Sequence, residues 1–111
     1  MTREIEKEFI EELRNRTKMR RLEWRRLPDT YNKLIPNIDY DKSYLAELGE
    51  ASVALVRNID GFLKCYICQS GNTTLIGQHC SAELNGLYKY ATDRVYPTVE
   101  TFVQDVISGV L

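Results

Sequence analysis

Long hydrophobic runs are missing from this chain of 111 residues. A membrane-spanning helix requires about 18 consecutive apolar residues, and no segment comes close to that length. The opening residues, Met-Thr-Arg-Glu-Ile-Glu, also lack the apolar core of a targeting signal. We therefore expect a soluble protein located in the cytoplasm, with no membrane association.

Cysteine and histidine are scarce, with three Cys and one His in the chain. An odd number of thiols is typical of a reducing compartment, because disulfide frameworks use cysteines in pairs. Cys65 and Cys68 have the spacing of a zinc knuckle, and His79 and Cys80 follow them. Cys65 and Cys68 lie in an alternating segment, however, and residues at that separation on a strand point to opposite faces. We therefore predict no metal and no cofactor, and a structural zinc site at these four residues is the third hypothesis.

Catalytic signatures are also missing. The chain has no Gly-x-Ser-x-Gly elbow and no glycine-rich phosphate loop, and its acidic residues are not spaced as a metal pair. A redox Cys-x-x-Cys pair requires its first Cys at a helix N-terminus, whereas Cys65 lies in an apolar, strand-like segment. His79 has Cys80 and Ser81 as neighbours, and adjacent residues seldom present a base to a nucleophile. We predict that the protein is not an enzyme.

The composition is that of an ordinary globular domain, with 43% hydrophobic and 28% charged residues. The length predicts a single domain over 1–111. Branched and aromatic side chains, which favour strands, are dense in 51–77, where 60–61 and 70–72 are turn signals. We predict an antiparallel meander in this segment, preceded by strands over 21–27 and 43–48.

Helical periodicity is found at both ends of the chain. The first predicted helix runs from 2 to 19, is capped by Thr2, and turns Ile5, Phe9 and Leu13 to the core. The second runs from a Ser81 cap to about residue 96. The third begins at Thr98, after Pro97, and has an apolar stripe of Val99, Phe102, Val103, Val106, Ile107 and Val110. The order of elements predicts an α+β fold: a small antiparallel sheet of roughly three to five strands with the N-terminal helix and two C-terminal helices packed on it.

Positive charge is concentrated in Arg14–Arg26, which has seven Lys or Arg and one acid, Glu23. Such a segment attracts phosphates, and Trp24 within it can stack on a base or anchor the core. The net charge of −1 and the pI of about 5.8 argue against nucleic acid as the main partner. A nucleic-acid-binding protein is therefore the second hypothesis, with the contact residues Arg20, Arg21, Trp24, Arg25 and Arg26.

Tyrosines gather around the segment 29–42, which is longer than most connections in a compact domain. Tyrosine is favoured at protein interfaces because it offers apolar area and a hydrogen bond at low entropy cost. Our leading prediction is a non-enzymatic protein-interaction or regulatory module that contacts its partner through Tyr31, Tyr40 and Tyr44 and through the exposed part of the basic segment. The apolar C-terminal stripe is predicted to dock on the body or on a second copy, which would give a homodimer.

One short pattern resembles a known group of proteins. Leu13-x-x-x-Thr17, with Trp24 seven residues after the threonine, is similar to small uncharacterised proteins of Gram-positive bacteria and their prophages. In those proteins an N-terminal helix runs through such a threonine into a Leu/Ile-x-Trp strand, which here reads Leu22-Glu23-Trp24. The resemblance implies a fold of the same α+β type and a bacterial or prophage context, and it implies no activity.

Overall fold

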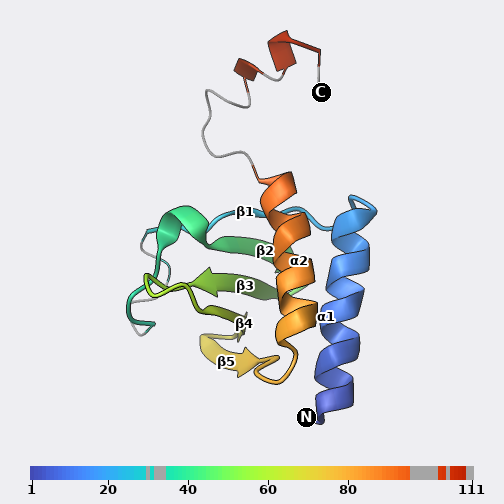
Figure 1. The fold of residues 1–111 in the computed structure, drawn as a ribbon, viewed down its shortest axis with the longest axis vertical. Helices are drawn as coiled ribbons and strands as arrows, with labels where there is room; N and C mark the ends of the chain where they lie inside the picture. The colour runs from blue at the N-terminus through green and yellow to red at the C-terminus, as the bar shows by residue number, and fades with distance from the viewer. Residues whose placement is uncertain (30, 32–34, 96–102, 105, 110–111) are drawn as a thin grey trace.

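The structure is a computed structural model that describes residues 1–29, 31, 35–95, 103–104 and 106–109. Its elements, in chain order, are α1 (Arg3–Lys18), β1 (Arg25–Arg26), the 3-10 helix η1 (Tyr40–Lys42), β2 (Tyr44–Leu48), β3 (Ala51–Arg57), β4 (Leu63–Gln69), β5 (Asn72–Ile76) and α2 (Ser81–Arg94). The five strands form one antiparallel sheet in the order β1-β2-β3-β4-β5, and α1 and α2 pack side by side against one face of it (Figure 1). The predicted α+β class and the antiparallel meander are confirmed.

The reversals of the meander occur where the sequence predicts them. Gln69 pairs with Asn72, so Ser70 and Gly71 close the hairpin between β4 and β5, with φ angles of 51° and 81°. Two positive φ angles are the signature of the type I′ turn, whose twist matches that of the strands it joins. Gly61, with φ of 93°, belongs to the turn between β3 and β4. Both turns are therefore local properties of the sequence.

The first helix is confirmed, but its buried face differs from the prediction. Thr2 caps α1, and its Oγ1 accepts a hydrogen bond from the backbone N–H of Ile5 at 3.2 Å. The fully buried residues are Ile10, Leu13 and Thr17, whereas Ile5 is 54% exposed. Ile5 lies in the first turns of α1, near the free N-terminal end of the helix (Figure 1). The prediction that Ile5 faces the core is wrong, because Ile5 lies outside the helical stripe that Ile10, Leu13 and Thr17 form on the buried face of α1.

The C-terminal part of the prediction is confirmed only for α2. This helix begins at Ser81, but the N-cap residue is Cys80 and makes no capping hydrogen bond with its side chain, so the predicted Ser81 cap is wrong. The predicted third helix falls largely on residues outside the described ranges, and a second C-terminal helix is not confirmed. Of its apolar stripe, Val103, Val106 and Ile107 are described, and all three are exposed.

Two apolar clusters lie on the two faces of the sheet. The helix-side core joins the helices to the sheet; its buried residues are Ile10, Leu13, Leu22, Trp24, Tyr44, Ala46, Val53, Leu55, Cys65, Ile76, Cys80, Leu84, Leu87 and Ala91. The opposite-face core consists of Leu27, Leu45, Ala54 and Val56, covered by Tyr31, Ile35, Ile38, Tyr40 and Tyr66. The predicted strand over 21–27 is reduced to β1, because only Arg25 and Arg26 pair with β2; Leu22 and Trp24 enter the helix-side core, and Leu27 enters the opposite-face core.

Gly86 lies in the interior of α2, where glycine is less favourable than alanine by about 1 kcal/mol. The nearest atom to an added Cβ would be Cδ of Arg14, at 3.7 Å, which is an ordinary contact. We expect Gly86→Ala to stabilise the fold by about 0.5–1 kcal/mol, because it reduces the conformational entropy of the unfolded chain without a clash. Urea unfolding monitored by circular dichroism measures this gain, and a lower midpoint than that of the wild type would contradict it.

Candidate functional site

The turn between β3 and β4, residues 58–62, is held in one conformation by several hydrogen bonds. The Asn58 side-chain oxygen accepts from the backbone N–H groups of Asp60 and Phe62, at 3.0 and 2.9 Å. The Arg57 guanidinium donates to the carbonyl of Gly61 at 2.6 Å. Because the side chains of Arg57 and Asn58, at the end of β3, bind the backbone of the turn, this hairpin turn is pre-organised.

The hairpin turn presents two large apolar side chains to solvent. Ile59 and Phe62 are 67% and 66% exposed. The backbone N–H of Ile59 donates to the carbonyl of Asn37 at 2.9 Å, which ties the turn to the segment before η1. Single exposed apolar residues are common on protein surfaces, whereas here two large ones stand three positions apart on one fixed turn, and exposed apolar groups of this kind often contact partners.

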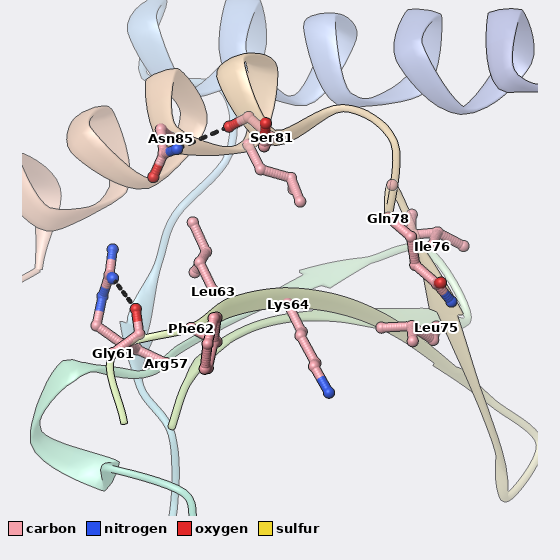
Figure 2. A pocket seen from close by; sticks show the side chains of 12 residues that line it. Arg57, Gly61, Phe62, Leu63, Lys64, Leu75, Ile76, Gln78, Ser81 and Asn85 are labelled. Atoms are coloured by element: carbon pink, nitrogen blue, oxygen red, sulfur yellow. Dashed lines mark hydrogen bonds between the residues drawn. The ribbon is translucent and has the colours of Figure 1, made fainter. Parts of the chain in front are cut away.

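A groove of about 280 Å³ lies beside the hairpin turn, between the start of β4, the end of β5 and the first turns of α2 (Figure 2). In that view Leu63 points toward α2, while Lys64 points away from it. The groove combines an apolar floor with amide and hydroxyl groups at its rim. The apolar lining is formed by Leu63, Ile76 and Leu84, and the amide and hydroxyl groups belong to Gln78, Ser81 and Asn85.

Two cations, Arg57 and Lys64, supply the charge among the residues lining the groove. The Arg57 guanidinium lies over the Tyr88 ring, 4.4 Å from its centroid, and Tyr88 in turn packs against Tyr44 with ring centroids 5.3 Å apart. Within the described residues, neither cation forms an ion pair. The groove is therefore an apolar recess lined by two cations that form no ion pair with a described carboxylate.

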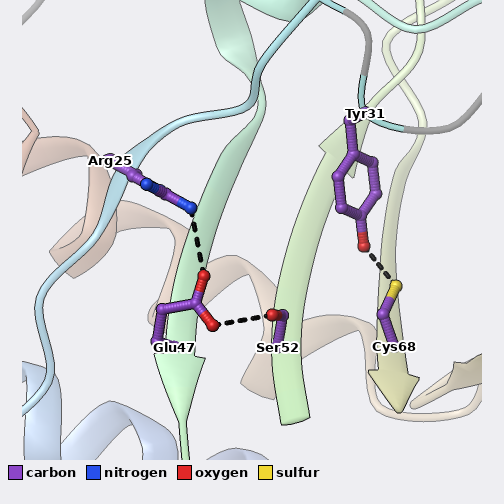
Figure 3. Close-up of polar contacts among 5 residues, drawn as sticks. All are labelled: Arg25, Tyr31, Glu47, Ser52 and Cys68. Carbon is purple, nitrogen blue, oxygen red and sulfur yellow. Dashed lines mark hydrogen bonds and ion pairs between the residues drawn. The ribbon is translucent and has the colours of Figure 1, made fainter. Parts of the chain in front are cut away.

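The two cysteines of the Cys-x-x-Cys pair lie on opposite faces of β4, as the alternation predicts. Cys65 is fully buried in the helix-side core. Cys68 lies on the other face, where its sulfur is in hydrogen-bond contact with the Tyr31 hydroxyl and lies 3.6 Å from Thr73 Oγ1 (Figure 3). Burial, followed by the contact with Cys68, raises the pKa of the Tyr31 hydroxyl. The sulfurs of Cys65 and Cys68 point to opposite faces of β4, which contradicts the hypothesis that both hold one zinc ion.

The remaining candidate zinc ligands are also separated by their surroundings. Cys80 is buried in the helix-side core, whereas its neighbour His79 is exposed. Burial raises the pKa of the Cys65 thiol to about 12, and burial followed by the nearby carboxylates of Glu83 and Glu6 raises the pKa of Cys80. Among the described residues, no group of three His, Cys, Asp or Glu side chains is placed to hold a metal ion.

Cys68 is expected to be the first thiol to react in the folded protein. It is half-buried, whereas Cys65 and Cys80 are 0% and 4% exposed, and their raised pKa values keep them as thiols at neutral pH. Mass spectrometry after brief iodoacetamide treatment should show a single modified site, and Cys68→Ser should abolish this early product. Equally rapid modification of Cys65 would contradict the described packing.

The basic segment is largely occupied by contacts within the chain. Arg25 forms an ion pair with Glu47 at 3.0 Å, and Glu47 also accepts a hydrogen bond from Ser52 at 2.9 Å (Figure 3). Arg26 lies 3.5 Å from Asp41. Two of the four arginines proposed to contact nucleic acid are thus already paired with carboxylates.

Trp24 is a core residue. It is 6% exposed, and its indole N–H donates to Thr17 Oγ1 at 2.8 Å. The hypothesis that Trp24 stacks on a base is therefore wrong, because its ring is enclosed between the helices and the sheet. Arg20 and Arg21 remain exposed at the surface.

Of the tyrosines predicted as partner contacts, Tyr44 is buried, whereas Tyr31 and Tyr40 are partly buried and their role as contacts stays a prediction. Tyr44 is 6% exposed in the helix-side core, and Tyr31 and Tyr40 cover the opposite-face core. Sequence reasoning missed the exposure of Ile59 and Phe62 on the hairpin turn. Their position on either side of the Asp-Gly turn signal was the available clue, since residues at a hairpin tip have few neighbours to bury them.

No protein-family model, no curated protein and no solved structure matches this chain. Its class is therefore defined by its own architecture, an α+β fold in which two helices cover one face of a five-stranded antiparallel meander. Neither of the two described helices is long and apolar enough to span a membrane. The resemblance to prophage proteins, based on Leu13, Thr17 and Trp24, stays a prediction.

Proposed function

We propose that this protein is a non-enzymatic protein-interaction module that binds a partner through the hairpin turn and the adjoining groove. The observation that carries the proposal is the exposure of Ile59 and Phe62 on a turn fixed by Asn58 and Arg57. Its three cysteines are free, which supports a site of action in a reducing compartment such as the cytoplasm. A bacterial or prophage setting follows from the resemblance alone.

Pre-organisation is the physical reason why this turn suits recognition. When a partner binds a flexible loop, the binding free energy must offset the conformational entropy that the loop loses. Residues 58–62 are already ordered by their hydrogen bonds, so this cost is smaller here. Aromatic side chains that enter a partner's pocket contribute much of the binding energy at protein interfaces. Phe62 is the aromatic residue placed to do so here.

The proposal is tested with Phe62→Ser and Ile59→Ser, and with Met19→Ser as the matched control, since Met19 is 62% exposed at the far end of α1. Quantitative affinity capture from the producing cell should lose its specific proteins with the two hairpin variants and keep them with the control. A purified partner should bind Phe62→Ser about 30-fold more weakly, which corresponds to about 2 kcal/mol for an anchoring aromatic.

All three variants should unfold within about 0.5 kcal/mol of the wild type, because the side chains are exposed. Light scattering over a dilution series tests whether the partner is a second copy of the chain, in which case Phe62→Ser should dissociate the dimer. Capture that is unchanged in both hairpin variants would overturn the proposal.

A further inference from the structure

We infer that the groove binds an extended segment of a partner protein in which a carboxylate adjoins an apolar residue, and that this segment lines up along the exposed start of β4. The inference rests on the proposed function and specifies the chemistry of the partner.

The sheet has an unfilled strand position at the groove. The last residue of β5, Ile76, pairs with Cys65, but β4 begins two residues earlier, at Leu63. Gly77 adopts φ of 72° and directs the chain away from β4 toward α2. The start of β4 therefore has no described strand beside it on this edge, and an incoming extended segment can continue the line of β5 by backbone hydrogen bonding.

The interior of the groove selects an apolar side chain. Leu63 points from β4 toward α2 (Figure 2), and Leu84 of α2 also lines the groove. The volume of about 280 Å³ is at the lower end of the range for ligand pockets, which is roughly 300–1,000 Å³. It therefore suits one or two side chains of a peptide better than a large cofactor.

The charge of the groove selects an acidic segment. Its charged lining residues are Arg57 and Lys64, and no acidic residue lines it. The nearby carboxylate of Glu83 lies outside the lining and is 3.8 Å from the Lys7 ammonium. Lys64 lies on the face of β4 opposite to Leu63, so in a strand beside β4 a carboxylate would face Lys64 while the apolar residue next to it faces the groove (Figure 2). A basic segment would be repelled by Arg57 and Lys64.

A second copy of this chain is a poorer occupant than a foreign segment. The edge strands that it offers are β1, which is Arg-Arg, and β5, which is Asn-Thr-Thr-Leu-Ile. Neither contains a carboxylate, so neither complements Arg57 and Lys64. Among the described strands, the edges of a second copy thus lack the required charge, which favours a different protein as the partner.

Selection of short random peptides on the full-length chain by phage display tests the inference. Enriched sequences are expected to place Asp or Glu next to Leu, Ile or Phe, and synthetic peptides of these sequences should shift the amide resonances of Leu63 and Lys64. Lys64→Glu should weaken their binding about tenfold, because it reverses one of the two attracting charges. Lys89→Glu, an exposed site on α2 outside the groove, makes the same charge change and should bind like the wild type.

The inference is overturned if no peptide is enriched, if the enriched peptides are basic or uncharged, or if they bind Lys64→Glu and the wild type equally. If one of these results is obtained and affinity capture still depends on Phe62, the proposed interaction module is supported. Only the acidic and apolar chemistry assigned to its partner is then wrong. Capture that does not depend on Phe62 or Ile59 overturns the module itself.

Discussion

Gly77→Ala should destabilise the protein by roughly 2–5 kcal/mol, a large part of the stability of a small domain. Gly77 has φ of 72°, which costs an L-residue about 1–2 kcal/mol. An added Cβ would also lie 2.6 Å from Cδ1 of Ile10, whose side chain is fully buried and cannot move aside freely. Overpacking of this kind adds about 1–3 kcal/mol.

The matched control for this substitution is Gly49→Ala. Gly49 also has a positive φ, 62°, but no atom lies within 4 Å of an added Cβ. Gly49→Ala should therefore lower the free energy of unfolding only by the cost of the positive φ angle, about 1–2 kcal/mol. Guanidinium unfolding of both variants separates backbone strain from the collision with Ile10. Equal losses in the two variants would contradict the close packing of the segment after β5 on α1.

Gly77 also connects stability to the proposed site. Its backbone N–H donates to the Glu6 carboxylate at 3.1 Å, which fastens the start of α1 to the segment after β5. The same residue lines the groove. We therefore expect Gly77→Ala to disturb peptide binding as well as folding, so it is unsuitable as a binding-site variant.

Thr17→Val should destabilise the protein by roughly 1–3 kcal/mol, although it preserves the shape of the side chain. The Thr17 hydroxyl is fully buried, donates to the Leu13 carbonyl at 2.7 Å and accepts from the indole N–H of Trp24 at 2.8 Å. Valine leaves that buried N–H without an acceptor, and the cost is the desolvation of the orphaned donor. Thermal unfolding followed by circular dichroism measures the loss, and it also serves variants that lack Trp24, the single tryptophan of the chain.

A double-mutant cycle isolates this hydrogen bond. Thr17→Ser keeps the hydroxyl and should lose only about 1 kcal/mol for the missing methyl group. Trp24→Phe removes the donor, so Thr17→Val should cost about 1 kcal/mol less in that background than in the wild type. Additive losses would show that Thr17 and Trp24 do not interact.

The contact also explains the spacing from Leu13 through Thr17 to Trp24: one hydroxyl joins the end of α1 to the segment that leads into β1.

Local features of the fold could be predicted because neighbouring residues decide them. Thr2 caps α1 because its hydroxyl reaches a free N–H in the first turn, and Gly61 and Gly71 mark the reversals that need positive φ. The opposite orientation of Cys65 and Cys68 follows from the two-residue period of a strand. None of these outcomes depends on which other elements lie nearby.

The candidate site could not be predicted in the same way. Tyrosine near a long connection favours an interface, yet Tyr31 and Tyr40 cover the opposite-face core because the segment before η1 folds across that face of the sheet. Trp24 lies between arginines in the sequence but enters the helix-side core to reach Thr17. In each case burial is set by a second layer whose position the local pattern does not encode.

The sequence by itself determined the strands, their reversals, the two described helices and the alternation that separates the paired thiols, because these depend on interactions between residues close together in the chain. Only the tertiary structure decided which aromatic residues are buried, which arginines are neutralised, and that Ile59 and Phe62 are left exposed beside a cationic groove. The physical reason is that burial and ion pairing arise between segments far apart in the chain, where packing decides which residues meet.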